Sequence, residues 1–238
     1  MKKLITALLG LSLVGIPALS QPDVEPKSYD AQGCMKLREC TDDIERITSF
    51  SQLSDRYGDT WASPYKEELT ELIKVMNDSG VEIYIAPDRY FVPNTRGLYY
   101  TDVNRLFLNH GYVRMESVFT DVFRHEGWHA AQDCMAGSID NSMIAVIHNS
   151  DKVPQRFKLA AEIRYGPYAV KVIPWEQEAI WAGNTPMMTL DALSSCASNA
   201  PMWWDYEPTP KTAFWLNNEG YNVTPPENYD NPRQRRSC

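Results

Sequence analysis

The sequence predicts an α+β protein in which one small sheet packs against several helices. Residues 81–85 (VEIYI) alternate with a period of two and are rich in strand-forming residues. The short apolar runs 98–100 and 105–108 flank the turn-forming segment 101–104, which is typical of a hairpin. Longer segments carry apolar residues at helical spacing. Because strand and helix patterns occur together in a chain of ordinary globular composition, we expect the α+β class.

Helical spacing predicts five helices, which cover residues 35–57, 64–78, 115–135, 156–165 and 175–183. The second is the clearest, because Pro64 stands at its start, acidic residues follow, and Gly80 ends it. Residues 21–33 are polar, contain two prolines and are expected to form a flexible lead-in. Near the end of the chain, prolines recur among aromatic residues. We therefore interpret residues 201–238 as an irregular tail wrapped over the domain formed by residues 21–200.

The N-terminal segment, residues 1–20, has the pattern of a signal peptide. Lys2 and Lys3 precede an apolar run, and the small residues Ala18 and Ser20 stand before an expected cleavage after Ser20. We therefore expect a secreted or periplasmic protein with no stable membrane span after cleavage. A retained anchor is the alternative, which the run disfavours because it is shorter than the roughly 20 residues that span a bilayer.

Five cysteines, an odd number, are present: Cys34, Cys40, Cys134, Cys196 and Cys238. Disulfides persist in an exported protein, and an odd count leaves at least one thiol free or paired between chains. The spacing permits a local Cys34–Cys40 bond together with a Cys134–Cys196 bond between distant segments. It equally permits a bond from Cys34 or Cys40 to Cys134. Cys238, the last residue, is the candidate for the odd thiol.

A short segment, His125-Glu126-Gly127-Trp128-His129, has the residues and the spacing of a zinc site. Two histidines four residues apart lie about 40° apart around a helix, so both imidazoles can ligate one Zn²⁺. Glu126 can then accept a proton from the attacking water and deliver it to a leaving amine. The alternative is a helix in which the two histidines have a structural role and bind no metal. A hydrolytic zinc site has three protein ligands, so a third is expected elsewhere.

Over residues 80–183 the chain resembles zinc metallopeptidases of the gluzincin kind. The stretch HEGWHAAQ, which begins at His125, is similar to their HExxHxxQ form, and WEQEA, which begins at Trp175, is similar to their ExEA form. The resemblance implies a zincin-like fold: a small sheet with an edge hairpin packed on the HExxH helix, and a second helix that bears a glutamate. It also implies one Zn²⁺ per chain held by His125, His129 and a glutamate, with Glu126 as general base.

Two glutamates compete for the place of third ligand. Its position three residues before Ala179 favours Glu176 in the resemblance, and Glu178 is the alternate. In the family an Asp or Asn stands four residues after the ligand, whereas this chain has Ile180. The hydrogen bond that orients a ligating histidine then has to come from another residue. Because Glu176 and Glu178 are two residues apart on a helix, they face different ways and only one of them can ligate.

Other polar residues are candidates for roles around this set. Gln132 and Asp133 follow the second histidine by about one turn and are candidates to hydrogen-bond around the site. His148, Tyr165 and Tyr168 fall between the two expected metal-bearing helices and are candidates to stabilise an oxyanion. Each is also a common packing or surface residue.

Together these observations favour a secreted zinc-dependent metallopeptidase whose partner is a peptide or protein substrate. An extended substrate would pair with one edge of the hairpin, either Leu98–Tyr100 or Arg105–Leu108, by strand addition. The net charge of −8 argues against nucleic acid as a partner. The alternative is a non-catalytic secreted metal- or ligand-binding module, for example an inactive relative of these peptidases.

Overall fold

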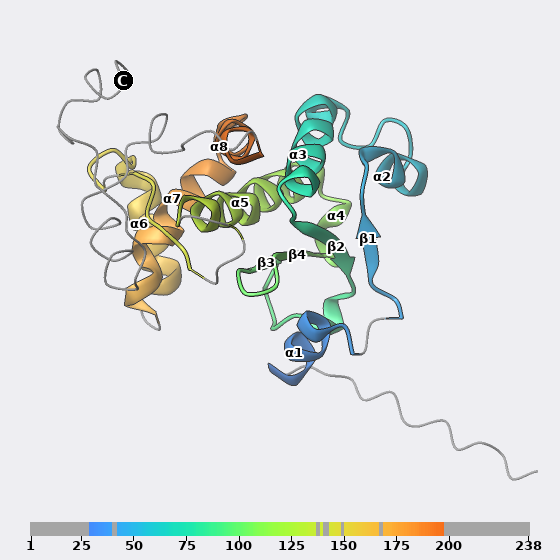
Figure 1. Ribbon diagram of the computed structural model, residues 1–238, viewed down its shortest axis with the longest axis horizontal. Helices are drawn as coiled ribbons and strands as arrows, with labels where there is room; N and C mark the ends of the chain where they lie inside the picture. Colours follow the sequence, from blue (N-terminus) through green and yellow to red (C-terminus); the bar gives the residue numbers. More distant parts are fainter. Residues whose placement is uncertain are drawn as a thin grey trace, which may run out of the picture.

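The computed structural model describes most of the central part of the chain, namely residues 29–39, 42–136, 139, 143–148, 150–166 and 169–197 (Figure 1). The expected signal peptide at residues 1–20 and the expected tail at residues 201–238 lie outside the described residues, as do Cys40 and Cys238. No helix of the described part is both long enough and apolar enough to cross a lipid bilayer.

A mixed sheet joins four short strands, β1 (Glu45–Ile47), β2 (Glu82–Ala86), β3 (Gly97–Tyr100) and β4 (Arg105–Asn109). Their order is β1-β2-β4-β3, so β1 and β3 are the edge strands and β4 is internal. β3 and β4 pair antiparallel, which confirms the predicted hairpin, and β2 confirms the predicted strand. β2 and β4 pair in parallel, and β1 pairs antiparallel with β2.

Eight α-helices complete the described part: α1 (Tyr29–Leu37), α2 (Phe50–Tyr57), α3 (Lys66–Asp78), α4 (His110–Val113), α5 (Glu116–Met135), α6 (Gln155–Tyr165), α7 (Ile173–Gly183) and α8 (Met188–Ala197). Figure 1 shows α5 running from the sheet, past α3 and α8, to the pair formed by α6 and α7. The structure is therefore of mixed α and β composition, in agreement with the predicted α+β class. The predicted helices 64–78, 115–135, 156–165 and 175–183 correspond to α3, α5, α6 and α7.

β2 is buried on both of its faces, which accounts for its almost uninterrupted apolar sequence. Ile83 and Ile85 belong to the main core with α3 and α5, whereas Tyr84 and Ala86 belong to a smaller cluster with Phe107. Alternate residues of a strand point to opposite faces of the sheet, so one strand supplies both clusters. The sheet thereby joins the two parts of the hydrophobic core.

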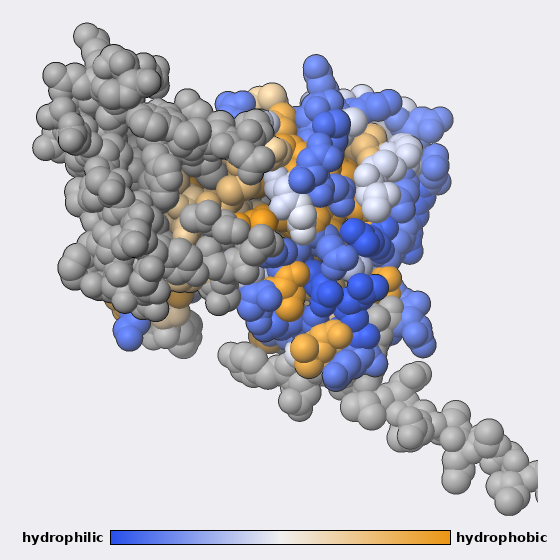
Figure 2. Space-filling model, in the orientation of Figure 1, coloured by the Kyte–Doolittle hydropathy of each residue, from blue (hydrophilic) through white to orange (hydrophobic). Residues whose placement is uncertain are grey.

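α3 shows the amphipathic pattern that its sequence predicts. Its buried side carries Leu69, Leu72 and Met76, and each is completely shielded from solvent. Its other side is hydrophilic and exposed (Figure 2). Glu68 is the exception, because this acidic residue is buried under the helix beside Arg124 of α5. Burial of the apolar stripe holds α3 against the core.

The prediction of a single helix over residues 35–57 is wrong. α1 begins within the segment expected to be a flexible lead-in, and it ends at Leu37, directly before Arg38, whose φ of 61° is left-handed. Ile47 of β1 pairs with β2 in the sheet. The side-chain oxygen of Gln52 accepts the backbone N–H of Ser49 at 3.1 Å and so starts α2. Apolar runs as short as these fit the period of a helix as well as that of a strand. In β1, pairing with β2 determines the strand conformation.

A disulfide joins Cys134 at the end of α5 to Cys196 of α8. It is one of the pairings that the spacing allowed, and it excludes the alternative in which Cys34 or Cys40 pairs with Cys134. Cys34 is also disulfide-bonded. The bond between α5 and α8 closes a loop of 62 residues that contains α6 and α7.

Candidate metal centre

α5 is surrounded closely because two neighbouring elements approach it through glycines. A Cβ atom on Gly183 of α7 would lie 2.8 Å from the backbone oxygen of Asp121 and 3.3 Å from the Cβ of His125. A Cβ on Gly97 of β3 would lie 2.8 Å from the Cγ of Glu126. Any larger residue would have to push α7 or β3 away from α5. These glycines therefore allow both elements to reach the HExxH segment.

A buried ion pair holds α5 against α3 next to the first histidine. Arg124 donates to both carboxylate oxygens of Glu68, from Nε at 2.8 Å and from Nη2 at 2.6 Å. Glu68 also accepts the backbone N–H of Met187 at 2.8 Å, which connects α3 to the start of α8. The two opposite charges neutralise each other, and the hydrogen bonds of Glu68 hold α3 and the start of α8 beside α5.

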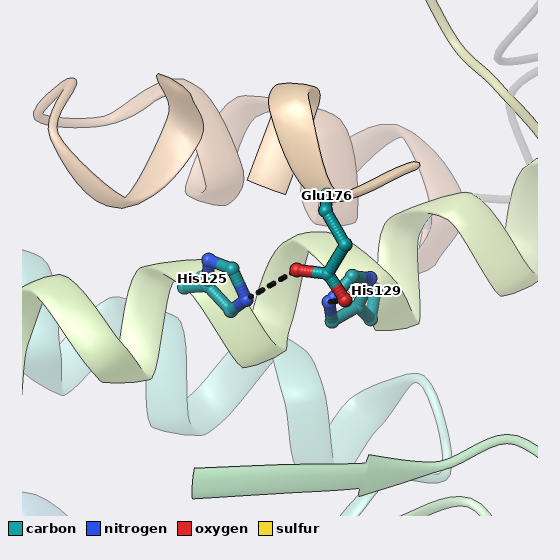
Figure 3. A group of neighbouring side chains, drawn as sticks. All are labelled: His125, His129 and Glu176. Carbon is teal, nitrogen blue, oxygen red and sulfur yellow. Dashed lines mark ion pairs between the residues drawn. The ribbon is translucent and has the colours of Figure 1, made fainter. Parts of the chain in front are cut away.

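His125, His129 and Glu176 bring their side chains together between α5 and α7 (Figure 3). His125 Nε2 lies 3.4 Å from Glu176 Oε2, and His129 Nε2 lies 3.7 Å from Glu176 Oε1. The three potential ligand atoms all lie within 4.8 Å of one another. Ligands about 2 Å from a tetrahedral zinc are roughly 3.3 Å apart, so the three side chains need only small movements to share one ion.

The Oε2 atom of Glu176 is buried and accepts no hydrogen bond from the described residues. Burial alone would raise the pKa of this carboxyl, but the imidazoles of His125 and His129 lower it to about 2. Glu176 is therefore ionised at neutral pH, as a metal ligand has to be. A buried, charged oxygen without a donor beside two imidazole nitrogens fits a divalent cation that prefers nitrogen and oxygen ligands.

Gln132 supplies the hydrogen bond that orients the second histidine. Its side-chain nitrogen donates to Glu178 Oε2 at 2.7 Å and to the backbone oxygen of Trp175 at 3.2 Å, so its Oε1 is free to accept. That oxygen lies 2.8 Å from His129 Nδ1. Where this oxygen accepts, Nδ1 is the donor, so in the neutral ring the lone pair of Nε2 faces Glu176. Gln132 thus takes the place that the resemblance gives to the residue at Ile180.

Glu178 follows Glu176 by two residues on α7 and is completely buried. Its carboxylate accepts from Gln132, from the indole N–H of Trp128 at 3.4 Å, and from the backbone N–H groups of Ile147 and His148. Burial raises the pKa of this carboxyl to about 7, although the four donors oppose the shift. The structure therefore brings Glu176, and not Glu178, to the two histidines.

Glu126 projects beside the triad and is 8% exposed. Burial raises its pKa to about 7, and the Glu176 charge adds to the shift while His129 opposes it. The backbone of Tyr99 on β3 donates a hydrogen bond to its carboxylate. A carboxyl group with a pKa near neutrality can both accept and return a proton.

A cleft of about 660 Å³ is lined by His125, Glu126, His129 and Glu176. One wall consists of β3 and the segment before it, residues 93–99, and the other consists of parts of α6 and α7. Because β3 is an edge strand, one side of Leu98–Tyr100 has no strand paired to it in the described part of the sheet. Arg105–Leu108, the other expected edge, lies between β2 and β3 and has no free edge.

The remaining candidates have different positions. Tyr165 lines the cleft, and its hydroxyl is hydrogen-bonded to Glu176. Asp133 accepts a hydrogen bond from the hydroxyl of Tyr99 at 2.7 Å, so it connects α5 to the edge strand. His148 does not line the cleft but stacks on Trp128. Tyr168 lies outside the described residues.

Sequence reasoning missed Tyr99, Arg96 and Arg164, which also line the cleft. The tyrosine belongs to the predicted hairpin, so its place on the edge strand was the only signal. The two arginines carried no signal in the sequence, because their proximity depends on how the segment before β3 and the end of α6 meet across the cleft.

No model of a known protein family, no curated protein and no solved structure matches the chain.

Proposed function

We propose that the chain is an exported zinc-dependent metallopeptidase of the gluzincin kind with a zincin-like fold. The observation that carries the proposal is the meeting of Glu176 with both histidines of the HExxH segment, at 3.4 and 3.7 Å. The position of Glu126 in the same cleft supports a hydrolytic role, because its carboxyl group is poised to accept a proton. The Cys134–Cys196 disulfide is compatible with an exported protein.

In this mechanism His125, His129 and Glu176 would hold one Zn²⁺. The ion would act as a Lewis acid that polarises a peptide carbonyl and makes water more acidic. Glu126 takes the proton of the attacking water and then gives it to the leaving amine. The hydroxyl of Tyr165 hydrogen-bonds with Glu176, and on substrate binding it turns to donate to the developing oxyanion.

Substrate binding follows from the position of β3 at the edge of the sheet. An extended peptide that pairs with Leu98–Tyr100 lies along the cleft, next to Glu126. The Tyr99–Asp133 hydrogen bond keeps this edge strand against α5. The strand therefore sets the distance between the scissile bond and the proton-accepting carboxylate.

The test compares three variants of the chain produced with its disulfides. Glu126→Gln is expected to bind zinc as the unmodified chain does and to lose peptide hydrolysis. Glu176→Ala is expected to lose zinc, whereas Glu116→Gln, on the same helix but away from the cleft, keeps zinc and activity. Zinc is measured by elemental analysis after dialysis, and hydrolysis by mass spectrometry of a diverse peptide mixture.

Two results contradict the proposal. Hydrolysis that is undiminished in Glu126→Gln excludes this glutamate as the base. Stoichiometric zinc without any hydrolysis by the unmodified chain supports the alternative, a metal-binding module without catalysis.

A further inference from the structure

Two arginines from separate elements line the cleft. Arg96 directly precedes β3, and Arg164 stands in the last turn of α6, next to Tyr165. Both are exposed to solvent. The chain as a whole has a net charge of −8, whereas the cleft that contains Glu126 has two positively charged guanidinium groups in its lining.

Each guanidinium is held by an aromatic ring and not by an acid. The Cζ of Arg96 lies 5.3 Å from the ring centre of Tyr112, and that of Arg164 lies 5.7 Å from the ring centre of Tyr165. Among the described residues, neither has a carboxylate within 4.0 Å, whereas Arg105 bonds Glu82 at 2.8 Å. A guanidinium stacked on a ring keeps its N–H edge available for hydrogen bonds.

Arg164 stands beside the candidate metal ligands through its neighbour in the chain. The hydroxyl of Tyr165 is hydrogen-bonded to Glu176, and all three residues line the cleft. Arg96 lies on the other wall of the cleft, which also contains Asp121, and its charge acts on that carboxylate. We therefore take Arg164 as the main cationic group for a ligand in the cleft.

We propose that the substrate of this cleft carries a carboxylate group close to the scissile bond, and that Arg164 binds it, with Arg96 as a weaker second contact. The planar guanidinium donates two parallel hydrogen bonds to a carboxylate, an arrangement that selects this group over a neutral amide. The carboxylate belongs either to a Glu or Asp side chain or to the free C-terminus of a peptide. The inference rests on the proposed metallopeptidase function.

The experiment measures the binding of peptide hydroxamates to the zinc-loaded full chain, because a hydroxamate binds the metal whether or not hydrolysis occurs. Three compounds share one backbone. The first has a Gln residue and a C-terminal amide and is neutral, the second replaces that amide by a free carboxylate, and the third replaces Gln by Glu. Zinc content is measured for every protein sample before the titration.

One of the two anionic compounds is expected to bind the unmodified chain about tenfold more tightly than the neutral one. Arg164→Gln is expected to remove this preference while the affinity of the neutral compound stays the same. Arg156→Gln is the matched control. This arginine is exposed on the same helix and stacks on Phe157 at 4.5 Å, but it does not line the cleft, so the preference remains.

The outcomes separate the two proposals. If the neutral hydroxamate binds and neither anionic compound binds more tightly, the carboxylate preference is refuted while the metal centre stands. A preference that survives Arg164→Gln refutes the role of this arginine. If no hydroxamate binds the zinc-loaded chain, the proposed metal centre fails and the inference with it. The compound that shows the preference identifies the source of the carboxylate as a side chain or a chain end.

Discussion

Replacement of Gln132 by leucine tests whether one amide orients His129 in the proposed metal centre. The amide makes three hydrogen bonds, to His129 Nδ1 at 2.8 Å, to Glu178 Oε2 at 2.7 Å and to the oxygen of Trp175 at 3.2 Å. Leucine has a similar size and makes none of them. Without an acceptor on Nδ1, the ring of His129 is free to rotate and to take the other tautomer, which turns a protonated nitrogen toward Glu176.

The expected loss of zinc affinity is about 10- to 100-fold, the usual effect of removing a group that orients a ligating histidine. The variant is expected to fold. Glu178 keeps its other donors, the indole of Trp128 and the N–H groups of Ile147 and His148. Loss of the hydrogen bonds to Glu178 and to the oxygen of Trp175 costs about 2–4.5 kcal/mol, less than the roughly 5–15 kcal/mol by which a typical domain is stable, and the freed ring of His129 can turn toward the cleft.

Zinc affinity is measured at one fixed pH by competition with a chromophoric chelator, after circular dichroism has shown that the variant is folded. Gln155→Leu, at the exposed first position of α6, is the control for the same side-chain change outside the site. If Gln132→Leu and Gln155→Leu bind zinc equally tightly, Gln132 does not orient His129. If Gln132→Leu is unfolded, the amide acts mainly through Glu178 and the reasoning is also refuted.

Three further predictions concern stability, measured as the free energy of unfolding in urea. Gly183→Ala is expected to be about 2 kcal/mol less stable than Gly33→Ala, because the new methyl group overlaps α5 in the first variant and meets nothing within 4 Å in the second; equal stabilities would contradict the close approach. Glu68→Gln is expected to lose about 3 kcal/mol, because it leaves the buried charge of Arg124 without its partner, and a loss below 1 kcal/mol would show that the pair is solvated. Burial lowers the pKa of His148 to about 4, so the unfolded chain binds a proton at higher pH than the folded chain does. Stability is therefore expected to fall by up to about 3 kcal/mol between pH 6.5 and pH 4, and His148→Phe is expected to flatten this dependence; an identical slope in the variant would assign the acid sensitivity to other groups.

The parts of the site that depend on one helix could be predicted from the sequence. The four-residue spacing of His125 and His129 places both on one face of α5 because the helical repeat requires it. The strand and the hairpin were equally accessible, since their patterns are local. β1 and α8 were not. β1 has only three residues and owes its conformation to pairing with β2, and the start of α8 lies beside Met187, whose backbone N–H bonds Glu68 of a distant helix.

The choice between the two glutamates of α7 shows why the rest of the site was out of reach. Glu176 and Glu178 differ by two positions and about 200° around the helix, and helix periodicity does not say which of them reaches the histidines. Only the resemblance favoured Glu176. Glu178 is held by the backbone N–H groups of residues 147 and 148, which donate to its carboxylate. A buried carboxylate needs donors, so this segment holds α7 in one rotation about its axis.

This rotation of α7 gives Glu176 and Glu178 different roles, and the role of Glu176 depends on that of Glu178. Glu176 faces the histidines with one oxygen lacking a donor, which is the property of a metal ligand. Glu178 has a full set of donors, and one of them is the amide that accepts from His129. Glu178 therefore orients His129 through Gln132, and it also fixes the rotation of α7 that directs Glu176 at His129. A carboxylate that bonds neither histidine thus helps to fix, through Gln132 and the 147–148 segment, the positions of His129 and Glu176 in the candidate metal centre.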